Sequence, residues 1–443
     1  MDATEPEGWP GVLHREGRTL CRLARNPNEL GAGPAAKGQS AVFHNPAMAG
    51  SRTRSVLLLQ HCIEAGLLGD GSIYALDGLS ATGLRARRWL NELPAQSAAR
   101  ISATMGDMDP VALDWAMCCH EEFPTEHGEG ELLPHLGDLR KSVLEHGRHW
   151  VDIDPYGSPL PFLDTAIQSL ARRGVAEISA TDSAALTGSS KSALLRRYGA
   201  RVRTDGLAHD SGLRVLLATV ARTAARHERS IEPLLSIWDS HHLRVSVRVL
   251  RGVEGANNVE GSLGWRVASP TAKEVSSSIE SGLQPETSLD SLPMHCFLPL
   301  SHPVDRSDKR ISGPMWIGSV GRTEAMVSMT EERALELCGP NAIEDDPVGW
   351  SEMDFEYERR RVTRSVRHIS EESGVIDAPH LILVDDLASW LGSGSPPSPS
   401  VMAEALRQAD HRAAVAHYGK PSFRTDAPWD DIVRTSREVH PPM

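Results

Sequence analysis

Cysteine is scarce in this chain of 443 residues: there are six cysteines, and none forms a CxxC pair. That pattern argues against a zinc ribbon and against a disulfide framework, and it suits a reducing compartment. The first residues, MDATEPEGWPG, lack the basic and apolar segment of a secretory signal, and no apolar run reaches the roughly 18 residues of a membrane span. We therefore expect a cytoplasmic protein with no membrane association.

Lysine is also rare, because only six of the 46 basic residues are lysines, and the formal net charge is −13. A general polyanion binder would be basic, so a nucleic-acid partner would have to meet a local basic face. Arginine suits bidentate phosphate contacts, although a skewed coding composition explains the same count and is favoured. The length and a hydrophobic content of 40% predict two or three ordinary globular domains.

The most informative stretch is WVDIDPYGSPLPFLD, at residues 150–164. An apolar strand runs into Asp154-Pro155-Tyr156-Gly157, after which Pro161 can begin a helix. We predict that the Asp154 carboxylate and the Pro155 carbonyl lie close together beside the Tyr156 ring, as in the tips that amino-group methyltransferases use. Two such acceptors can aim an exocyclic amine at an electrophilic methyl group. The alternative is a strand end whose aspartate caps the next helix.

Carboxylates end four successive predicted strands. Apolar segments at 73–76, 101–105, 132–136 and 150–153 precede Asp77, Asp107, Asp138 and Asp154. Helical patterns between the first strands predict an α/β fold with a doubly wound sheet. Ligands bind at the carboxyl ends of strands in such sheets, so we expect the four acids to converge on one crevice.

A loop of small residues, DGLSATG at 77–83, follows the first of these strands. A ligand can approach the backbone closely there, although the glycines do not form GxGxxG and alone are a weak cofactor signal. Asp107 occupies the position that holds ribose hydroxyls in such folds. We expect Asp109 to cap a helix that begins at Pro110, and Asp138 to be able to accept an adenine amino group.

Two further patches combine aromatic or polar residues with arginines. The first contains Phe43, Asn45 and Pro46, followed by Arg52 and Arg54 just ahead of a predicted helix. This patch could clamp an anion or a base, or it could simply be a solvated helix start.

The second patch follows a predicted strand at 175–180. It contains Thr181 and Asp182, and then Arg196 and Arg197 beside Tyr198. Basic groups interleaved with an aromatic ring suit an RNA contact, and an exposed helix end explains them equally well.

Four segments are predicted along the chain. Residues 1–40 form an irregular arm, 41–252 the sheet domain, 253–293 a flexible linker or excursion rich in serine and glycine, and 294–443 a second, smaller α+β domain. In that last segment Arg360, Arg364 and Arg367 share one helical face, which could track phosphates or pair with neighbouring glutamates.

Ordered motifs across most of the chain resemble the tRNA guanine-26 N2-dimethyltransferase family. They are VFHNPAM, SRTRS, LDGLSATGLRARRWLNE, DMDPVALDWA, GDL, VDIDPYGSPLPFLDTAIQSL, TDSAALTGSSKSALLRRYGA, HHLRVSVRVL, GPMWIG and SFRTDAPW. The resemblance implies a Rossmann-like methyltransferase sheet, S-adenosylmethionine as methyl donor, and the exocyclic N2 of a guanine in tRNA as acceptor, most specifically at position 26. It also implies that the 294–443 domain binds tRNA.

Site roles follow from the resemblance position by position. Arg52 and Arg85 would contact the methionine end of the donor or its surroundings, Asp107 the ribose, and Asp138 with Leu139 the adenine. The residues themselves add Asp77 to this cofactor-binding set.

The same resemblance implies that the Asp154 carboxylate and the Pro155 carbonyl grip the guanine amine, while Tyr156 and Phe43 stack on the base. Asn45, Pro46, Thr181, Asp182, Arg196 and Arg197 complete the predicted substrate-binding set. Relatives carry Asn-Arg-Asp where this chain has Ser51-Arg52-Thr53, and paired cysteines where only Cys296 stands, so we expect no metal.

Two other functions stay open on sequence grounds. One is an inactive RNA-binding or tRNA-folding module, and the other is the same chemistry on another RNA or tRNA position. The crevice of carboxylates favours catalysis, because a binder of polyanions gains nothing from it. The sequence does not distinguish one methyl transfer from two, and a monomer is the default expectation.

Overall fold

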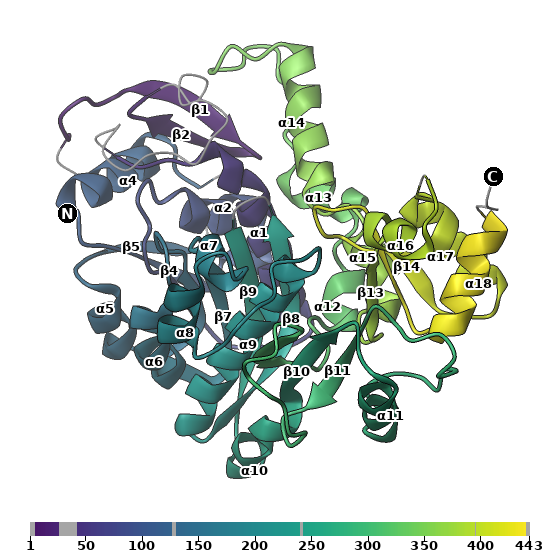
Figure 1. Cartoon of the computed structure of the whole chain (residues 1–443). Coiled ribbons are helices and arrows are strands. Elements are labelled where there is room, and N and C mark those ends of the chain that lie inside the picture. Colours follow the sequence, from purple (N-terminus) through teal and green to yellow (C-terminus); the bar gives the residue numbers. More distant parts are fainter. Residues whose placement is uncertain (1–4, 26–41, 126–129, 240–241, 395, 440–443) are drawn as a thin grey trace. The chain divides into compact units, whose positions relative to one another are not determined.

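The structure of the chain is a computed structural model that describes residues 5–25, 42–125, 130–239, 242–394 and 396–439 (Figure 1). These residues divide between two compact units. The first unit comprises Met1–Asp154, Asp164–Glu177 and Ser328–Arg367. The second comprises Pro155–Leu163, Ile178–Val327 and His368–Met443.

Seven strands form the largest sheet, in the order β5-β4-β3-β6-β7-β9-β8. Their bounds are β3 (Ile73–Asp77), β4 (Ile101–Asp107), β5 (Glu131–Leu136), β6 (Arg148–Ile153), β7 (Leu170–Ala180), β8 (Arg229–Asp239) and β9 (His242–Arg251). In the first unit β3 pairs in parallel with β4 and β6, and β4 with β5; in the second unit β8 and β9 pair antiparallel. The strand order reverses between β3 and β6, where open α/β sheets bind ligands. The predicted α/β class is confirmed.

The helices of the first unit come before, between and after these strands in the chain. They are α1 (Ala49–Glu64), α2 (Leu84–Glu92), α3 (Ala95–Ala98), α4 (Pro110–Glu122), α5 (Leu139–Glu145), α13 (Glu331–Cys338) and α14 (Glu352–Arg364), with the short 3-10 turn η2 (Pro46–Met48) before α1. Asp109 caps α4 as predicted, because its side chain accepts the Val111 N–H at 3.0 Å and Pro110 opens the helix. The buried rings of Trp89 and Trp150 meet edge to face in the core.

The N-terminal arm is not irregular where the structure describes it. β1 (Val12–Glu16) and β2 (Thr19–Leu23) form an antiparallel hairpin, and alternate residues of β2 are fully buried. The two-residue turn places Gly17 at a φ of 58°, the conformation that such hairpin turns need. The expectation was therefore wrong for residues 5–25, whereas residues 26–41 lie outside the described residues. Arg52 and Arg54 also differ from expectation, because both lie inside α1.

The strand predicted at 175–180 begins earlier than expected. It is β7, which starts at Leu170, directly after α6 (Leu160–Ser169). Residues 175–180 are buried throughout, so strand pairing of this apolar run outweighs the helical preference of the residues before it.

Two small sheets lie in the second unit, with strand orders β11-β10-β12 and β13-β15-β14. Their bounds are β10 (Leu263–Ala268), β11 (His295–Pro299), β12 (Ile311–Trp316), β13 (His380–Leu383), β14 (Ala413–Val415) and β15 (Ser422–Thr425). The helices and 3-10 turns of this unit are α7 (Ser183–Leu186), α8 (Lys191–Tyr198), α9 (Ala208–Arg226), α10 (Val253–Asn257), η3 (Asn258–Ser262), α11 (Ala272–Glu280), α12 (Thr323–Val327), α15 (Ile369–Glu372), η4 (Ser373–Val375), α16 (Val384–Leu391), α17 (Pro399–Gln408) and α18 (Trp429–Val439).

Residues 253–293 are not merely a flexible linker. They include β10, which is the central strand of its sheet, and α11, which begins with a capping box between Thr271 and Glu274. The polar composition of this segment reflects these helix ends and turns. Residues 328–367, expected in the C-terminal domain, belong to the first compact unit. The SFRT residues of the last motif form strand β15, and all four are buried in the sheet.

No helix among the described residues is long and apolar enough to cross a lipid bilayer.

Candidate active site

A cluster of acids lies at the carboxyl ends of β3 and β6 in the first unit. The Asp77 side chain is buried and the Asp152 side chain is fully buried, while Asp154 is 17% exposed. Arg85 of α2 is the cation of this cluster: its Nη2 lies 2.6 Å from Asp154 Oδ2, and its Nε lies 3.5 Å from Asp152 Oδ1. Three carboxylates therefore surround one guanidinium group, and the cluster carries an excess of negative charge.

The effect of that excess is visible at Asp77. Burial, and then the charges of Asp152 and Asp154, raise the pKa of Asp77 to about 7, against the opposing charge of Arg85. The Asp77 Oδ2 atom is buried and has no hydrogen-bond partner among the described residues. Such an acceptor is costly to bury, and a cationic ligand would relieve the cost. Buried carboxylates with a strongly raised pKa cluster at functional sites.

Asp107 shapes the loop that follows β3. Its Oδ2 accepts the Ala81 N–H at 2.9 Å, and its Oδ1 accepts the Asp109 N–H at 3.0 Å. Ala81 has a φ of 45°, which is unusual for a residue with a side chain and is stabilised by this bond. The carboxylate of β4 and the small-residue loop of β3 thus meet at one edge of the sheet, as the sequence predicts.

Gly78 begins the same loop and packs tightly. A Cβ at this position would lie 2.1 Å from Leu139 Cδ1 and 3.0 Å from the Asp152 carbonyl oxygen. Leu139, at the start of α5, is almost fully buried. Only glycine fits between Leu139 and the end of β6.

Asp138 lies at the end of β5 but uses its carboxylate locally. It caps α5 by accepting the Arg140 N–H at 2.8 Å, and it forms an ion pair with the Arg140 side chain at 2.6 Å. Hydrogen bonds from the Arg140 side chain hold the pKa of Asp138 at about 2. Its proposed contact with adenine would have to share this carboxylate and stays a prediction.

The tip after Asp154 is anchored in the second unit by Thr181, at the end of β7. The Gly157 N–H donates to Thr181 Oγ1 at 2.6 Å, and the Thr181 N–H donates to the Gly157 carbonyl at 2.9 Å. The Thr181 hydroxyl faces the Pro155 carbonyl at 3.5 Å. Gly157 has a φ of 86°, which permits the sharp turn. Tyr156 is 51% exposed and can offer a ring face to a ligand.

Asp182 follows the anchor and is already bonded. The Tyr198 hydroxyl donates to Asp182 Oδ1 at 2.9 Å, and Arg197 forms an ion pair with Asp182 at 3.0 Å. Ser158, one residue beyond the tip, also contacts the Tyr198 hydroxyl at 2.9 Å. Arg196 is exposed on α8. Both arginines remain predicted substrate contacts, with Arg197 partly neutralised.

The N-terminal patch is arranged by a buried ion-pair network that sequence reasoning missed. Arg52 binds Glu16 through two bonds of 2.6 and 2.5 Å and also donates to the Asn45 carbonyl at 3.1 Å. Arg88 of α2 lies 3.0 Å from Glu16 and 2.7 Å from Glu92. Arg52 is therefore occupied within the protein, and its proposed contact with the donor stays a prediction.

The Asn45 side chain has a local role, because it caps η2 by accepting the Ala47 N–H at 3.0 Å, and Pro46 is the first residue of that turn. Phe43 is half-buried. The sequence offered no signal for Glu16, which lies far from Arg52 along the chain. Asp152 could have been found from its spacing, because it lies two residues before Asp154, which directly follows β6, and side chains two residues apart in an extended segment point to the same side.

One trio among the described residues has the composition of a metal site. His14, Glu16 and His44 place one ligand atom each within 4.8 Å of one another. Burial lowers the pKa of His14 to about 4 and that of His44 well below its usual value, so both rings are neutral. Arg52 and Arg88 already bind the Glu16 carboxylate, and a divalent cation would have to displace them. The expectation of no metal stays a prediction.

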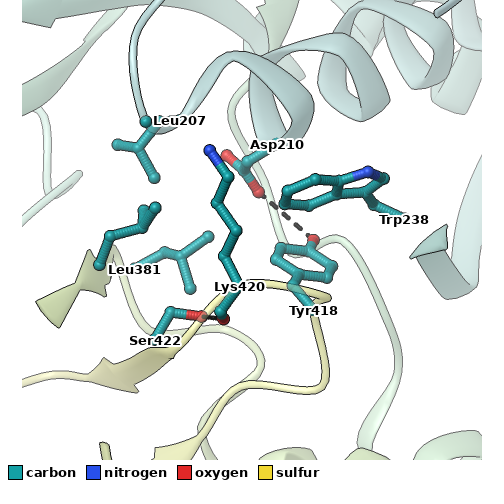
Figure 2. Close-up of a pocket in the computed structure, with 9 residues that line it drawn as sticks. Leu207, Asp210, Trp238, Leu381, Tyr418, Lys420 and Ser422 are labelled. Atoms are coloured by element: carbon teal, nitrogen blue, oxygen red, sulfur yellow. Dashed lines mark hydrogen bonds between the residues drawn. The ribbon is translucent and has the colours of Figure 1, made fainter. Parts of the chain in front are cut away.

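A pocket in the second unit, between α9, β8 and the β13–β15 sheet, has an interior of only about 10 Å³ (Figure 2). The Tyr418 hydroxyl donates to Asp210 at 3.3 Å, and Asp210 pairs with Arg214 at 2.8 Å. Lys420 lies over the Trp238 ring at 5.7 Å. The volume is that of about one water molecule, so this pocket is a packing feature and not a substrate site.

Comparison with known proteins decides the family. The model of the N2,N2-dimethylguanosine tRNA methyltransferase family matches residues 32–437. The chain belongs to this family. The match spans both compact units and every motif on which the resemblance depends, so the predicted relationship to the N2,N2-dimethylguanosine tRNA methyltransferases is confirmed.

Individual relatives of the family agree. The tRNA (guanine(26)-N(2))-dimethyltransferase of Thermococcus kodakarensis is 28% identical over 408 residues, which are 90% of this chain and 93% of that protein. The protein of the same name from Aeropyrum pernix is 28% identical over 438 residues, 95% of each chain. The solved structure of Trm1 from Pyrococcus horikoshii with S-adenosyl-L-methionine covers 96% of this chain and 99% of that chain, with a TM-score of 0.72 at 23% identity, and shows the same fold.

Proposed function

We propose that the chain transfers methyl groups from S-adenosylmethionine to the exocyclic N2 of guanine 26 in tRNA, giving N2-methyl- and N2,N2-dimethylguanosine. Membership of the family and the names of the relatives support this function. The observation that carries it is the acid cluster at the ends of β3 and β6, continued by the Asp154-Pro155-Tyr156-Gly157 tip.

The residues of the first unit fit the donor. S-adenosylmethionine carries a sulfonium and an ammonium group, and the buried Asp77 and Asp152 carboxylates offer negative charge that can face them. The unpaired Asp77 Oδ2 is the acceptor that such a cation would satisfy. Asp107, beside the small-residue loop, is the candidate for the ribose hydroxyls, with Asp138 and Leu139 at the adenine. When bound, the donor supplies an already activated methyl group.

Asp154 and the tip hold the acceptor base. The amine of guanine is a weak nucleophile because its lone pair is delocalised into the ring. The Asp154 carboxylate and the Pro155 carbonyl can accept its two N–H groups and so orient the nitrogen. The amine proton becomes acidic only as the nitrogen is methylated, and Asp154 is the base that takes it. Arg85 keeps this carboxylate directed through the 2.6 Å ion pair.

Tyr156 supplies the contact that a flipped base needs. A guanine within folded tRNA has to leave its stack, at a cost of a few kcal/mol. Stacking on an exposed ring returns about 1–3 kcal/mol, and Tyr156 is 51% exposed next to the proposed acceptors. The tip is held by Thr181 through backbone bonds, so the Pro155 carbonyl and the Tyr156 ring are placed before substrate arrives.

Methyl transfer to unmodified tRNA tests the proposal. Wild-type protein is incubated with labelled S-adenosylmethionine and tRNA carrying guanine 26, and the nucleosides are identified by mass spectrometry. We expect N2-methyl- and N2,N2-dimethylguanosine from the wild type and none from Asp154→Asn, with donor binding kept. Asp70→Asn, an exposed carboxylate before β3, is the matched control and should behave as wild type.

Failure would take one of two forms. A wild type that binds tRNA without methylating it would support an inactive binding module. Methylation of a tRNA in which guanine 26 is replaced would place the target elsewhere.

All six cysteines are buried free thiols, which supports a reducing compartment, and we propose the cytoplasm as location.

A further inference from the structure

A shallow hollow in the second unit is lined by residues that have no role assigned above, although it borders α8, the helix that carries Arg196 and Arg197. It is bordered by the C-terminal end of α8, by β10 and β12, and by the loop between β11 and β12. Arg201, Trp265, Arg306 and Gly313 line it, and its interior measures about 20 Å³. Sites that enclose small molecules measure about 300–1,000 Å³, so the hollow suits a group that passes over it.

Two exposed arginines form its rim. The Arg306 guanidinium lies 5.5 Å from the centre of the buried Trp265 ring, a cation–π contact that fixes its orientation. Arg201 Nη1 donates to the Arg306 carbonyl at 3.0 Å. Among the described residues, neither guanidinium group has an ion pair with a carboxylate.

The acids nearest along the loop are already bonded. Asp305 accepts the Ser307 N–H at 2.8 Å, and Asp308 pairs with Arg310 at 2.7 Å. The Asp305 and Asp308 carboxylates therefore bind other partners in the loop and not the Arg306 guanidinium group.

One arginine of α9 responds to the charge of Arg306. Arg222 of α9 is half-buried; burial, and then the charge of Arg306, lower its pKa, whereas the exposed Glu260 has a smaller opposing effect. Arg201 and Arg306 thus place two guanidinium groups at the rim, with no carboxylate in an ion pair with either of them among the described residues. In a chain with a formal net charge of −13, such a local surplus is not a consequence of general composition.

The backbone holds the rim in place. Arg201 and Gly313 exchange two hydrogen bonds, of 2.9 and 2.7 Å, which tie the residues after α8 to β12. Gly313 has a φ of 131°, and a Cβ there would lie 2.8 Å from the Gly264 carbonyl oxygen. The close approach needs glycine, and it makes the hollow a fixed feature of the sheet.

We propose that Arg201 and Arg306 form a docking point for one phosphodiester of the tRNA backbone. Planar guanidinium groups bind phosphate oxygens in pairs, and a shallow open hollow admits a phosphate that remains part of a chain. The role of this surface is to position the tRNA, since phosphate contacts fix register and carry no base information. The proposal rests on tRNA being the substrate.

The test compares Arg306→Ala, Arg306→Lys and Arg407→Ala in the full chain. Arg407 is another exposed arginine, on α17, where it pairs with Glu404, and it serves as the control. Binding of unmodified tRNA is measured by fluorescence anisotropy across a range of salt concentrations, and donor binding by calorimetry. Arg306→Ala should raise the tRNA Kd about tenfold and reduce the slope of log K against log salt by about one. Arg306→Lys should keep the slope but not the full affinity.

The outcomes separate this proposal from the function on which it rests. Equal tRNA affinity and salt slope in Arg306→Ala, Arg407→Ala and wild type would overturn the docking point, even if methylation is normal. A loss of tRNA affinity in Arg306→Ala but not in Arg407→Ala, with donor binding unchanged, would support the docking point, even if the wild type methylates no tRNA. Thermal unfolding of each variant checks that the exposed substitutions leave the fold intact, and Arg201→Ala provides a second, independent removal.

Discussion

Donor binding should depend on pH through Asp77. Burial and the neighbouring carboxylates raise the pKa of Asp77 to about 7, so this group gains a proton in the range where the enzyme would work. A cationic donor favours the ionised form and must displace that proton at lower pH. Affinity for S-adenosylmethionine should therefore rise as pH rises through the pKa of Asp77.

The size of the effect follows from the pKa. With a value of about 7, Asp77 is ionised in roughly one molecule in ten at about pH 6 and in roughly nine in ten at about pH 8. If only the ionised form binds, the donor Kd should fall about tenfold across that range, equivalent to about 1.4 kcal/mol. Calorimetric titrations at both pH values measure this change, and buffers of different ionisation enthalpy report the released proton.

Two variants make the reasoning refutable. Asp77→Asn should bind the donor more weakly at high pH and lose this component of the pH dependence. Asp107→Asn should bind more weakly throughout but keep the wild-type slope, which separates Asp77 from ionisation of the donor itself. A wild-type slope that persists in Asp77→Asn would refute the assignment.

Protein stability gives an independent check on Asp77. Its pKa is raised from 3.8 in the unfolded chain to about 7 in the donor-free protein, so the native state keeps the proton over that interval. Stability should consequently fall as pH rises between these values, and Asp77→Asn should remove that component of the fall.

Three further substitutions test the framework around the site. Arg85→Ala should remove the cation that faces Asp154 and Asp152. It should destabilise the protein by about 3–5 kcal/mol in urea unfolding and abolish transfer, whereas Arg85→Lys should recover part of the stability. Equal unfolding midpoints for the alanine variant and wild type would contradict the ion pair. Thr181→Val should leave the Gly157 N–H unsatisfied at a cost of about 1–3 kcal/mol and lower kcat without changing the donor Kd, with recovery in Thr181→Ser; an unchanged kcat would exclude a positioning role. Glu16→Gln should destabilise the protein by about 3–5 kcal/mol. Arg52 and Arg88 outweigh burial and hold the Glu16 pKa well below its usual value, so the stabilising effect of Glu16 should be present near neutral pH and disappear as acid protonates the carboxylate. Acid and urea titrations of the variant that match wild type would refute this.

The sheet was predictable because its strands have recognisable sequence patterns. β3, β4, β5 and β6 are short apolar runs that each end at an acid or just before one, and parallel pairing brings their carboxyl ends to one edge. Asp77, Asp107 and Asp154 lie at that edge for this reason alone. The tip itself was predictable from the proline and glycine that bracket Tyr156.

The remaining features depend on contacts that periodicity does not encode. Glu16 pairs with Arg52, and these residues come from a hairpin and a helix whose association no local pattern reveals. The arginines of α1 look solvated in sequence and are buried in the structure. β10 was not predicted, because it lies in a segment rich in serine and glycine. A single central strand of six residues gives little periodic hydrophobic signal.

The N-terminal hairpin has a practical consequence for anyone shortening this protein. Residues 12–23 stand outside the seven-stranded sheet and would be the first to be trimmed in the search for a minimal enzyme. Their removal would strip the shared carboxylate from Arg52 and Arg88, which have almost no access to solvent that could replace it. A fragment cut at the start of α1 should therefore be recovered as misfolded material, and affinity tags belong upstream of the hairpin.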